Sequence, residues 1–383
     1  MTLSKQKIGE ILVINTVISL PWGFAYTNIS FILVLLFVLF FPKSIGDLIF
    51  RSQYLPLFLF FIVHVISFGT YFEGDFLVKA YDLVYPLLPL VIFPLFLNNI
   101  NLSKLVFNRL LITFSISTLC IGIFVLIKYM LLEREMTLRN VTLLYTNIHI
   151  PYYALYLITS LLAMYFIKIR NKYLYSYFLF SLIILLFLGS KMGVLNLIGV
   201  LVLYILKEQK KIIKYVVPLL IISLPLIFLY TPFGHRFNQE IIKQSDQSRL
   251  RNWKSGMKTI SDSFWLGYGF GNEKEALQKH RPKNSYEYKE GYNSHNQFID
   301  IAITFGMLGL ILYIFMMLYY VYIGYQRNNF FLIIFILVFN ISSLTENLLD
   351  RQKGIILFSV FVPLLLIWER NDNKDYIRQT KTK

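Results

Sequence analysis

The chain has a single cysteine among its 383 residues, and that cysteine, Cys120, lies inside an apolar run. One cysteine excludes a disulfide and a cysteine-based metal site within the monomer. Charged residues are also scarce, at 15% of the chain against roughly a quarter in soluble domains. No group of acidic residues demands a metal ion, so we expect neither a metal site nor another cofactor. These shortages argue against a disulfide framework and against a soluble domain.

The sequence also lacks a cleavage motif and a repeat. Residues 1–7 are basic and residues 11–20 are apolar, which imitates a signal peptide, but no small-x-small motif follows. We therefore expect a first spanning helix rather than a removed leader. No internal repeat or low-complexity segment is present, so a solenoid is not expected.

Apolar residues are abundant at 56% of the chain, and aromatic residues at 17%. Apolar runs of spanning length are spread over the whole chain rather than confined to one anchor. The sequence predicts an all-α integral membrane protein of about twelve transmembrane helices with a large extracytoplasmic helical loop. The predicted spans cover residues 8–23, 27–42, 53–71, 77–97, 106–131, 150–168, 174–190, 192–207, 213–230, 296–324, 329–345 and 353–368.

The basic residues indicate how these helices are oriented. The net charge is +16, and strongly basic short loops alternate along the chain, such as 168–172 and 207–214. The positive-inside rule then places both termini in the cytoplasm and the loop 231–294 outside. No stripe of Lys and Arg interleaves with aromatic residues, so nucleic acid is not an expected partner. Basic residues at the ends of apolar runs instead favour contact with anionic membrane lipid.

This topology divides the chain into four parts. Residues 1–230 hold the first nine helices, and 231–294 form the extracytoplasmic (periplasmic) loop. Residues 295–368 hold helices ten to twelve, and 369–383 are a basic cytoplasmic tail.

Within the outward loop, residues 248–264 have the periodicity of an amphipathic helix. The expected apolar stripe consists of Leu250, Trp253, Met257, Ile260 and Phe264, the opposite basic side of Arg251, Lys254 and Lys258, and the expected cap is Asp246 or Ser248. Such a helix should lie in the membrane interface with its apolar side down. Arg249 stands one turn before Trp253, where it can reach a group at headgroup depth.

His295 stands where the polar outward loop re-enters a long apolar helix. An imidazole titrates near neutral pH, so histidine is a common general base. A histidine at a membrane boundary, downstream of an Arg-rich segment, favours chemistry on an anionic, lipid-linked substrate.

The order of motifs resembles that of the bacterial O-antigen ligase and polymerase superfamily. The matching motifs are Arg249-x-x-x-Trp253, then Leu266-Gly-Tyr-Gly-Phe-Gly271, then His295-Asn296 followed by Gly306 and Gly309. Ser190-Lys191 stands where family members have a Ser-Arg pair, which keeps the charge and loses the bidentate fork. Thr345-Glu346-Asn347 is similar to the segment carrying the family's outward Glu. The resemblance covers roughly residues 189–350.

The resemblance implies a glycosyltransferase of the bacterial inner membrane with its site facing the periplasm. It implies transfer of a glycan from undecaprenyl diphosphate to a hydroxyl of lipid A–core or of another lipid-linked glycan, with inversion and without a metal. His295 would be the catalytic base. The diphosphate would be bound by Arg249, Lys191 and Arg251, and the supporting residues would be Asn296, Trp253 and Glu346.

Each assignment has a plainer alternative. Arg249 and Arg251 also fit headgroup anchors, which for Arg251 is the favoured interpretation; Lys191 also fits an ordinary helix-end charge. Asp300 lies five residues after His295, well around the helix, so we do not expect it to orient the imidazole.

The competing function is a lipid-linked oligosaccharide flippase or other multi-pass transporter, which should show symmetric halves and broken helices near the bilayer midplane. A membrane scaffold would leave the Arg-Trp and His-Asn motifs unexplained.

Overall fold

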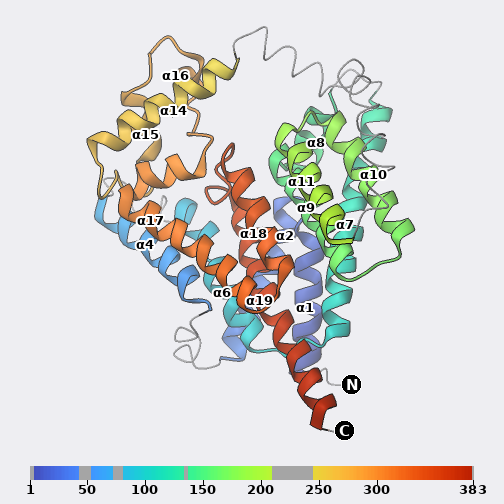
Figure 1. The fold of residues 1–383 in the computed structure, drawn as a ribbon. Coiled ribbons are helices and arrows are strands. Elements are labelled where there is room, and N and C mark those ends of the chain that lie inside the picture. Colours follow the sequence, from blue (N-terminus) through green and yellow to red (C-terminus); the bar gives the residue numbers. More distant parts are fainter. Residues whose placement is uncertain (1–3, 43–52, 72–80, 133–136, 209–244, 382–383) are drawn as a thin grey trace. The chain divides into compact units, whose positions relative to one another are not determined.

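A computed structural model describes residues 4–42, 53–71, 81–132, 137–208 and 245–381, which form helices and no strands. The helices are α1 (Lys5–Ser19), α2 (Phe24–Phe40), α4 (Leu55–Tyr71), the 3-10 helix η1 (Tyr85–Leu87), α6 (Pro89–Asn98), α7 (Lys104–Leu131), α8 (Leu138–Thr146), α9 (Ile150–Phe166), α10 (Asn171–Phe187), α11 (Lys191–Glu208), α14 (Ser245–Asp262), α15 (Glu273–Lys279), α16 (Tyr286–Lys289), α17 (Gln297–Gln326), α18 (Phe330–Ser343) and α19 (Gln352–Lys381). They form two compact units (Figure 1).

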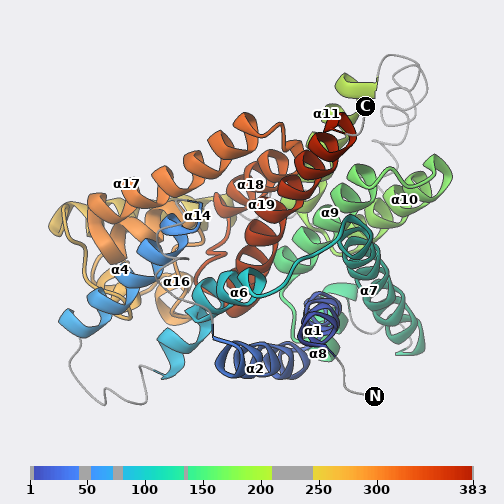
Figure 2. The ribbon, with the colours of Figure 1, turned by 90° about the horizontal axis from the view of Figure 1, so that it is seen from below.

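The first unit contains Met1–Leu20, Phe24–Leu110 and Ser248–Lys383. Its central helix is α19, in which residues 353–366 are all buried, as expected of a helix that is apolar on every side. Helices α6 and α18 pack on α19, and α17 packs on α18 and α4. Figures 1 and 2 show α17, α18 and α19 side by side, and Figure 1 shows α14, α15 and α16 at one end of α17. We call these three short helices and their loops the cap.

The second unit contains Pro21–Gly23 and Leu111–Gln247. Its centre is α9, buried over residues 152–164, and α8, α10 and α11 all pack on this helix. Helix α8 meets α9 at a bend of 89°, which makes the pair a broken span or a re-entrant loop.

Every predicted span except 213–230 overlaps a helix of the structure, and 213–230 lies outside the described residues. Three described helical stretches are long and apolar enough to cross a membrane: Tyr81–Asn98, which includes η1 and α6, Lys104–Leu131 (α7) and Gln297–Gln326 (α17). The bent α8–α9 pair can count as a fourth. Other apolar helices are shorter, and the total of twelve spans stays a prediction. Helix α19 also extends through most of the predicted basic tail.

Helix α14 lies where the amphipathic helix is predicted, but the buried side of α14 is polar. Asn252, Ser255 and Thr259 are buried, while Leu250 and Met257 remain 53% and 60% exposed. Of the predicted apolar stripe, Ile260 alone joins a described core cluster, with Ala276 and Ile303. A helix that packs through polar residues and leaves apolar ones outside suits an interface with lipid. Its depth in the membrane stays a prediction, and the side chains of the predicted caps lie outside the described residues.

Helix α17 is broken at Gly306, whose backbone is left-handed (φ 65°, ψ −166°). Segment 264–269 of the cap occupies the break and supplies the missing backbone hydrogen bonds. Tyr268 and Gly269 donate to the carbonyls of Ile303 and Thr304 (both 2.9 Å), while Met307 donates to the Phe264 carbonyl (2.8 Å). A Cβ on Gly267 would lie 2.5 Å from the Gly306 nitrogen, so this contact requires glycine. We call it the backbone splice.

Candidate functional site

The loop 293–296 that precedes α17 is fixed by its own side chains. Asn296 caps the helix, because its Oδ1 accepts from the N–H groups two and three residues further on (3.0 and 3.2 Å). Ser294 Oγ donates to the Asn296 carbonyl (2.8 Å), and Asn293 Oδ1 accepts from the His295 N–H (3.2 Å). These bonds hold His295 in the left-handed region at φ 50°, at a cost of roughly 1–3 kcal/mol. The loop thus holds its histidine in one strained geometry.

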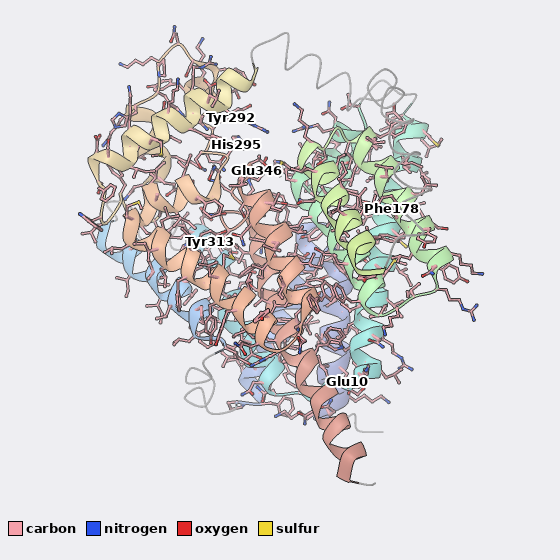
Figure 3. All side chains as sticks on the ribbon, in the orientation of Figure 1. Glu10, Phe178, Tyr292, His295, Tyr313 and Glu346 are labelled. Atoms are coloured by element: carbon pink, nitrogen blue, oxygen red, sulfur yellow. The ribbon has the colours of Figure 1, made fainter. Side chains whose placement is uncertain are left out.

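The His295 imidazole faces a carboxylate. Its Nδ1 lies 3.5 Å from Oε2 of Glu346, and the two side chains are 28% and 21% exposed. The Tyr292 ring stands perpendicular to the imidazole at 5.4 Å. Figure 3 shows Tyr292, His295 and Glu346 in succession, from the cap toward the end of α18. Because a carboxylate faces Nδ1, this nitrogen is the favoured place for the ring's proton, and Nε2 is then the basic atom.

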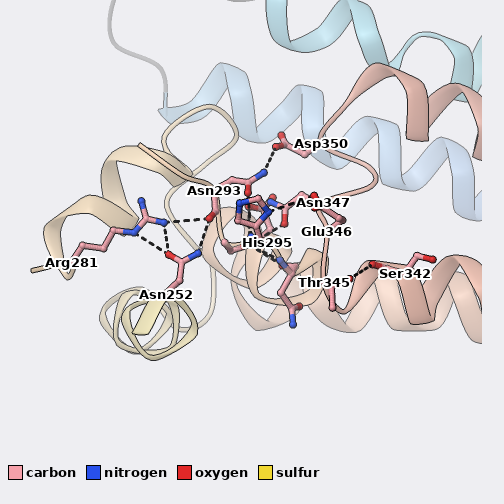
Figure 4. Close-up of polar contacts among 12 residues, drawn as sticks. Asn252, Arg281, Asn293, His295, Ser342, Thr345, Glu346, Asn347 and Asp350 are labelled. Carbon is pink, nitrogen blue, oxygen red and sulfur yellow. Dashed lines mark hydrogen bonds and ion pairs between the residues drawn. The ribbon is translucent and has the colours of Figure 1, made fainter. Parts of the chain in front are cut away.

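Beneath this pair, the turn after α18 is bound to the start of α17. Ser294 Oγ approaches Asn347 Oδ1 (3.1 Å), and Gln297 Oε1 accepts from the Leu349 N–H (2.6 Å). Asn293 Nδ2 reaches Asp350 at 3.4 Å (Figure 4). We call residues 293–297 with 346–350 the polar junction. It fixes Glu346 relative to His295 although the two residues lie far apart in the sequence.

Two further carboxyls lie near the junction. The Asp300 carboxylate approaches Ser294 Oγ (3.4 Å) and not the imidazole, as its spacing led us to expect. The carboxylate that contacts the imidazole is that of Glu346. Glu273, at the start of α15, is buried; burial and the negative charge of Asp350 raise its pKa. In the described part of the chain, no three His, Cys, Asp or Glu side chains are grouped to hold a metal ion.

Helix α14 is attached to the junction through a buried arginine. Asn252 Nδ2 donates to the Asn293 carbonyl (2.7 Å). Arg281 donates from Nε and Nη2 to Asn252 Oδ1 and from Nη2 to the Asn293 carbonyl (3.3 Å). Burial lowers the pKa of Arg281 to about 10, partly offset by Glu287. These bonds fix α14 in register with the histidine loop (Figure 4).

This attachment determines where the Arg249-x-x-x-Trp253 motif lies. Asn252, Trp253 and Gly256 follow Arg249 by three, four and seven residues, so all four share one side of α14. Gly256 lies against the start of α17: a Cβ on it would be 2.6 Å from Ile299 Cγ2. Arg249 stands exposed at the end of this side, with no ion pair to a described residue. Trp253 is half-buried, and its Nε1 has no hydrogen bond among the described residues.

The other two predicted diphosphate ligands are placed differently. Arg251 forms an ion pair with the buried Glu287 (3.1 Å), while its own side chain stays 46% exposed. Lys191 belongs to the second unit, where it is the first residue of α11. Ser190 Oγ accepts from the Gly193 N–H (3.3 Å) at that helix start. Glu346, Asn296 and His295 are therefore together in one place, and Arg249 and Trp253 are on the helix attached to them.

Several positioning residues could not be found from the sequence. Asn252 and Arg281 were assigned no role, Asn347 was noted only as the neighbour of Glu346, and each acts through a contact between distant segments. Tyr292 gave no signal either. A weak signal was available on α14, where small and polar residues repeat at helical spacing at 252, 255, 256 and 259.

These features define an all-helical membrane protein in which an imidazole meets a carboxylate at the start of an apolar helix. A model of the family described as O-antigen ligase matches residues 176–314, and this match supports membership of the O-antigen ligase superfamily. The match includes every candidate site residue except Glu346. Similarity to this family supports a glycosyltransferase-type enzyme. No curated protein matches the chain.

Proposed function

We propose that this protein transfers a glycan from undecaprenyl diphosphate to an acceptor hydroxyl on the outer face of the bacterial inner membrane. The single observation that supports this most strongly is the His295–Glu346 contact at the start of α17, inside a chain that matches the O-antigen ligase family. Ligase and polymerase share a donor and differ in acceptor, which is lipid A–core or another lipid-linked glycan. Both acceptors fit the same site chemistry.

In the proposed step, His295 acts as general base. Nε2 takes the proton of the acceptor hydroxyl while that oxygen bonds to the anomeric carbon of the donor sugar. Glu346 stabilises the imidazolium that forms, through its 3.5 Å contact with Nδ1. Attack from the side opposite the leaving group inverts the anomeric centre. No metal is assigned a part in this step.

The bond between the anomeric carbon and the diphosphate oxygen breaks, and undecaprenyl diphosphate leaves with the electron pair. Fixed cations stabilise this growing charge. Arg249 is the preferred candidate, because it is exposed and stands on the side of α14 attached to the histidine loop. Lys191 is the second, because a helix start with a cation attracts phosphate. Arg251 is a weaker candidate, since Glu287 already pairs with it.

The transporter alternative gains one observation, since α17 and the α8–α9 pair are both broken. A transporter offers the freed backbone groups of a broken helix to its substrate or ion. In α17 the backbone splice occupies those groups instead. This difference favours the enzyme.

The test is transfer by purified protein in lipid vesicles containing the host's lipid-linked glycan. We expect His295→Ala to lower the rate by about 10²–10⁴-fold and Arg249→Ala by about 10²-fold, with membrane insertion unchanged. Lys258→Ala, an exposed cation on the same helix, is the control for charge. Normal transfer by both site variants would reject the proposed roles. Deletion of the gene in the host distinguishes the two acceptors. A single repeat on surface lipid A–core would indicate a polymerase. Bare lipid A–core together with accumulating lipid-linked chains would indicate a ligase.

A further inference from the structure

Two tyrosines of the cap lead from solvent to the candidate base. Tyr286, the first residue of α16, is 58% exposed. Its ring lies 5.6 Å from that of Tyr292 at 88°, and the Tyr292 ring lies 5.4 Å from the His295 imidazole at 90°. The three rings thus form a row of edge-to-face contacts that ends at the imidazole. We call Tyr286 and Tyr292 the ledge. Nothing in the proposed proton transfer uses the two tyrosines.

The scaffold beneath this ledge is rigid. Ser285 Oγ caps α16 by accepting from the Tyr288 N–H (3.2 Å), and the Tyr292 N–H donates to the Glu287 carbonyl (3.2 Å). The Glu287 side chain is buried and paired with Arg251 at 3.1 Å. The tyrosines are therefore held in place before any ligand arrives, which reduces the entropy lost on binding.

We infer that Tyr286 and Tyr292 form a subsite that binds a sugar ring of the transferred or accepting glycan, an inference that rests on the proposed function. An aromatic face carries partial negative charge, and the C–H groups on one side of a pyranose ring carry partial positive charge. A sugar stacks on such a face through those groups while its hydroxyls remain free for polar neighbours. Lys289 and Glu290 are exposed on the same segment of the cap and offer charged groups for such contacts.

The surroundings favour a sugar over a membrane headgroup as the occupant. Apart from Pro282, residues 281–291 contain no aliphatic side chain. The exposed apolar side chains of the rest of the cap lie at Leu250 and Met257 of α14 and at Phe264, Trp265 and Leu266, the last three where the chain joins the break in α17. An aromatic anchor in a membrane interface has an apolar end in lipid, whereas this ledge is flanked by charges.

The test measures binding separately from transfer. The probe is the oligosaccharide released by mild acid from the host's own lipid-linked pool, titrated into full-length protein in lipid nanodiscs. We expect Tyr286→Ala and Tyr292→Ala each to raise Kd about threefold to tenfold, whereas Tyr286→Trp and Tyr292→Phe stay within about twofold. Tyr325→Ala, which removes an exposed tyrosine at the other end of α17, is the matched control and should leave Kd unchanged.

His295→Ala distinguishes the two proposals, because it should bind the oligosaccharide normally and fail to transfer it. Unchanged Kd in both alanine variants would overturn the subsite and leave the proposed transfer intact. Normal transfer by His295→Ala would instead overturn the proposed function. Quenching of the Tyr286→Trp fluorescence by brominated lipid, measured against the parent protein, would show that the ledge is a headgroup anchor and would also overturn the subsite.

Discussion

Helix α17 is held in two places by two kinds of contact. At its start, the polar junction holds it through side chains: Asn296, Ser294 and Gln297 each bond to a partner that another side chain could also satisfy. At Gly306, the backbone splice holds it through peptide groups alone. A side-chain contact weakens by degrees when it is altered, whereas two backbones in contact leave no room for a Cβ. The reacting groups, which must adapt to a substrate, therefore lie at the junction. The part of α17 whose geometry must not change lies at the splice.

The strongest test of this comparison is Gly306→Ala. A Cβ there meets the Trp265 backbone and requires a positive φ, so we expect a loss of at least about 4 kcal/mol in unfolding free energy. The measurement is the yield and thermal unfolding of purified protein in detergent. Gly199→Ala, whose Cβ would meet nothing within 4 Å, is the control and should be neutral. A stable Gly306→Ala protein would mean that the two regions do not differ as described.

Side-chain contacts at the junction should respond in graded steps, and Arg281, which attaches α14 to the junction, tests this. Arg281→Ala leaves Asn252 Oδ1 without its buried donor and removes one of the two donors to the Asn293 carbonyl, which should cost about 3 kcal/mol. Arg281→Lys should retain part of that free energy, because one cation remains. Thermal unfolding measures both variants, with the exposed Lys283→Ala as control. An equal loss of stability in the alanine and lysine variants would show that the response is not graded.

Glu346→Gln should leave the fold intact and slow the reaction. A neutral amide stabilises an imidazolium less than a carboxylate does, so we expect the transfer rate to fall about tenfold to hundredfold with little change in substrate KM. Glu275→Gln changes an exposed acid of α15 and should have no effect. A fall in thermal stability together with rate would show that Glu346 is structural rather than a partner of the base.

The smallest effect is a dependence of stability on pH. The folded protein holds the Glu273 proton more tightly than the unfolded chain, because burial and Asp350 raise the pKa of this carboxyl. Its stabilising contribution is therefore complete below the unfolded pKa and is lost as pH rises through the folded pKa. Glu273→Gln should remove this part of the pH dependence and raise Tm at neutral pH by a few degrees at most. Parallel pH profiles for parent and variant would contradict this.

Local sequence patterns predicted the helices, but they could not predict which segments far apart in the chain contact one another. An apolar run predicted α17 and an amphipathic periodicity predicted α14, because each helix carries its own local signal. The motif 266–271 and Gly306 were recognised separately, since nothing in a sequence says that two glycines touch. The same holds for Asn252 with Asn293. Glu346 was suggested by resemblance, and its contact with His295 depends on a turn whose position is set by Asn347 and Gln297.

The backbone splice also has a consequence for biosynthesis. The ribosome releases segment 264–269 before any residue of α17, so the N–H and C=O groups that close the break exist before the break does. As one straight helix, the 30 residues of α17 would extend about 45 Å, beyond a hydrocarbon core of roughly 30 Å. We therefore expect α17 to enter the membrane overlong and to shorten when the waiting segment engages it. On this expectation, α17 takes its final shape only after segment 264–269 is in place.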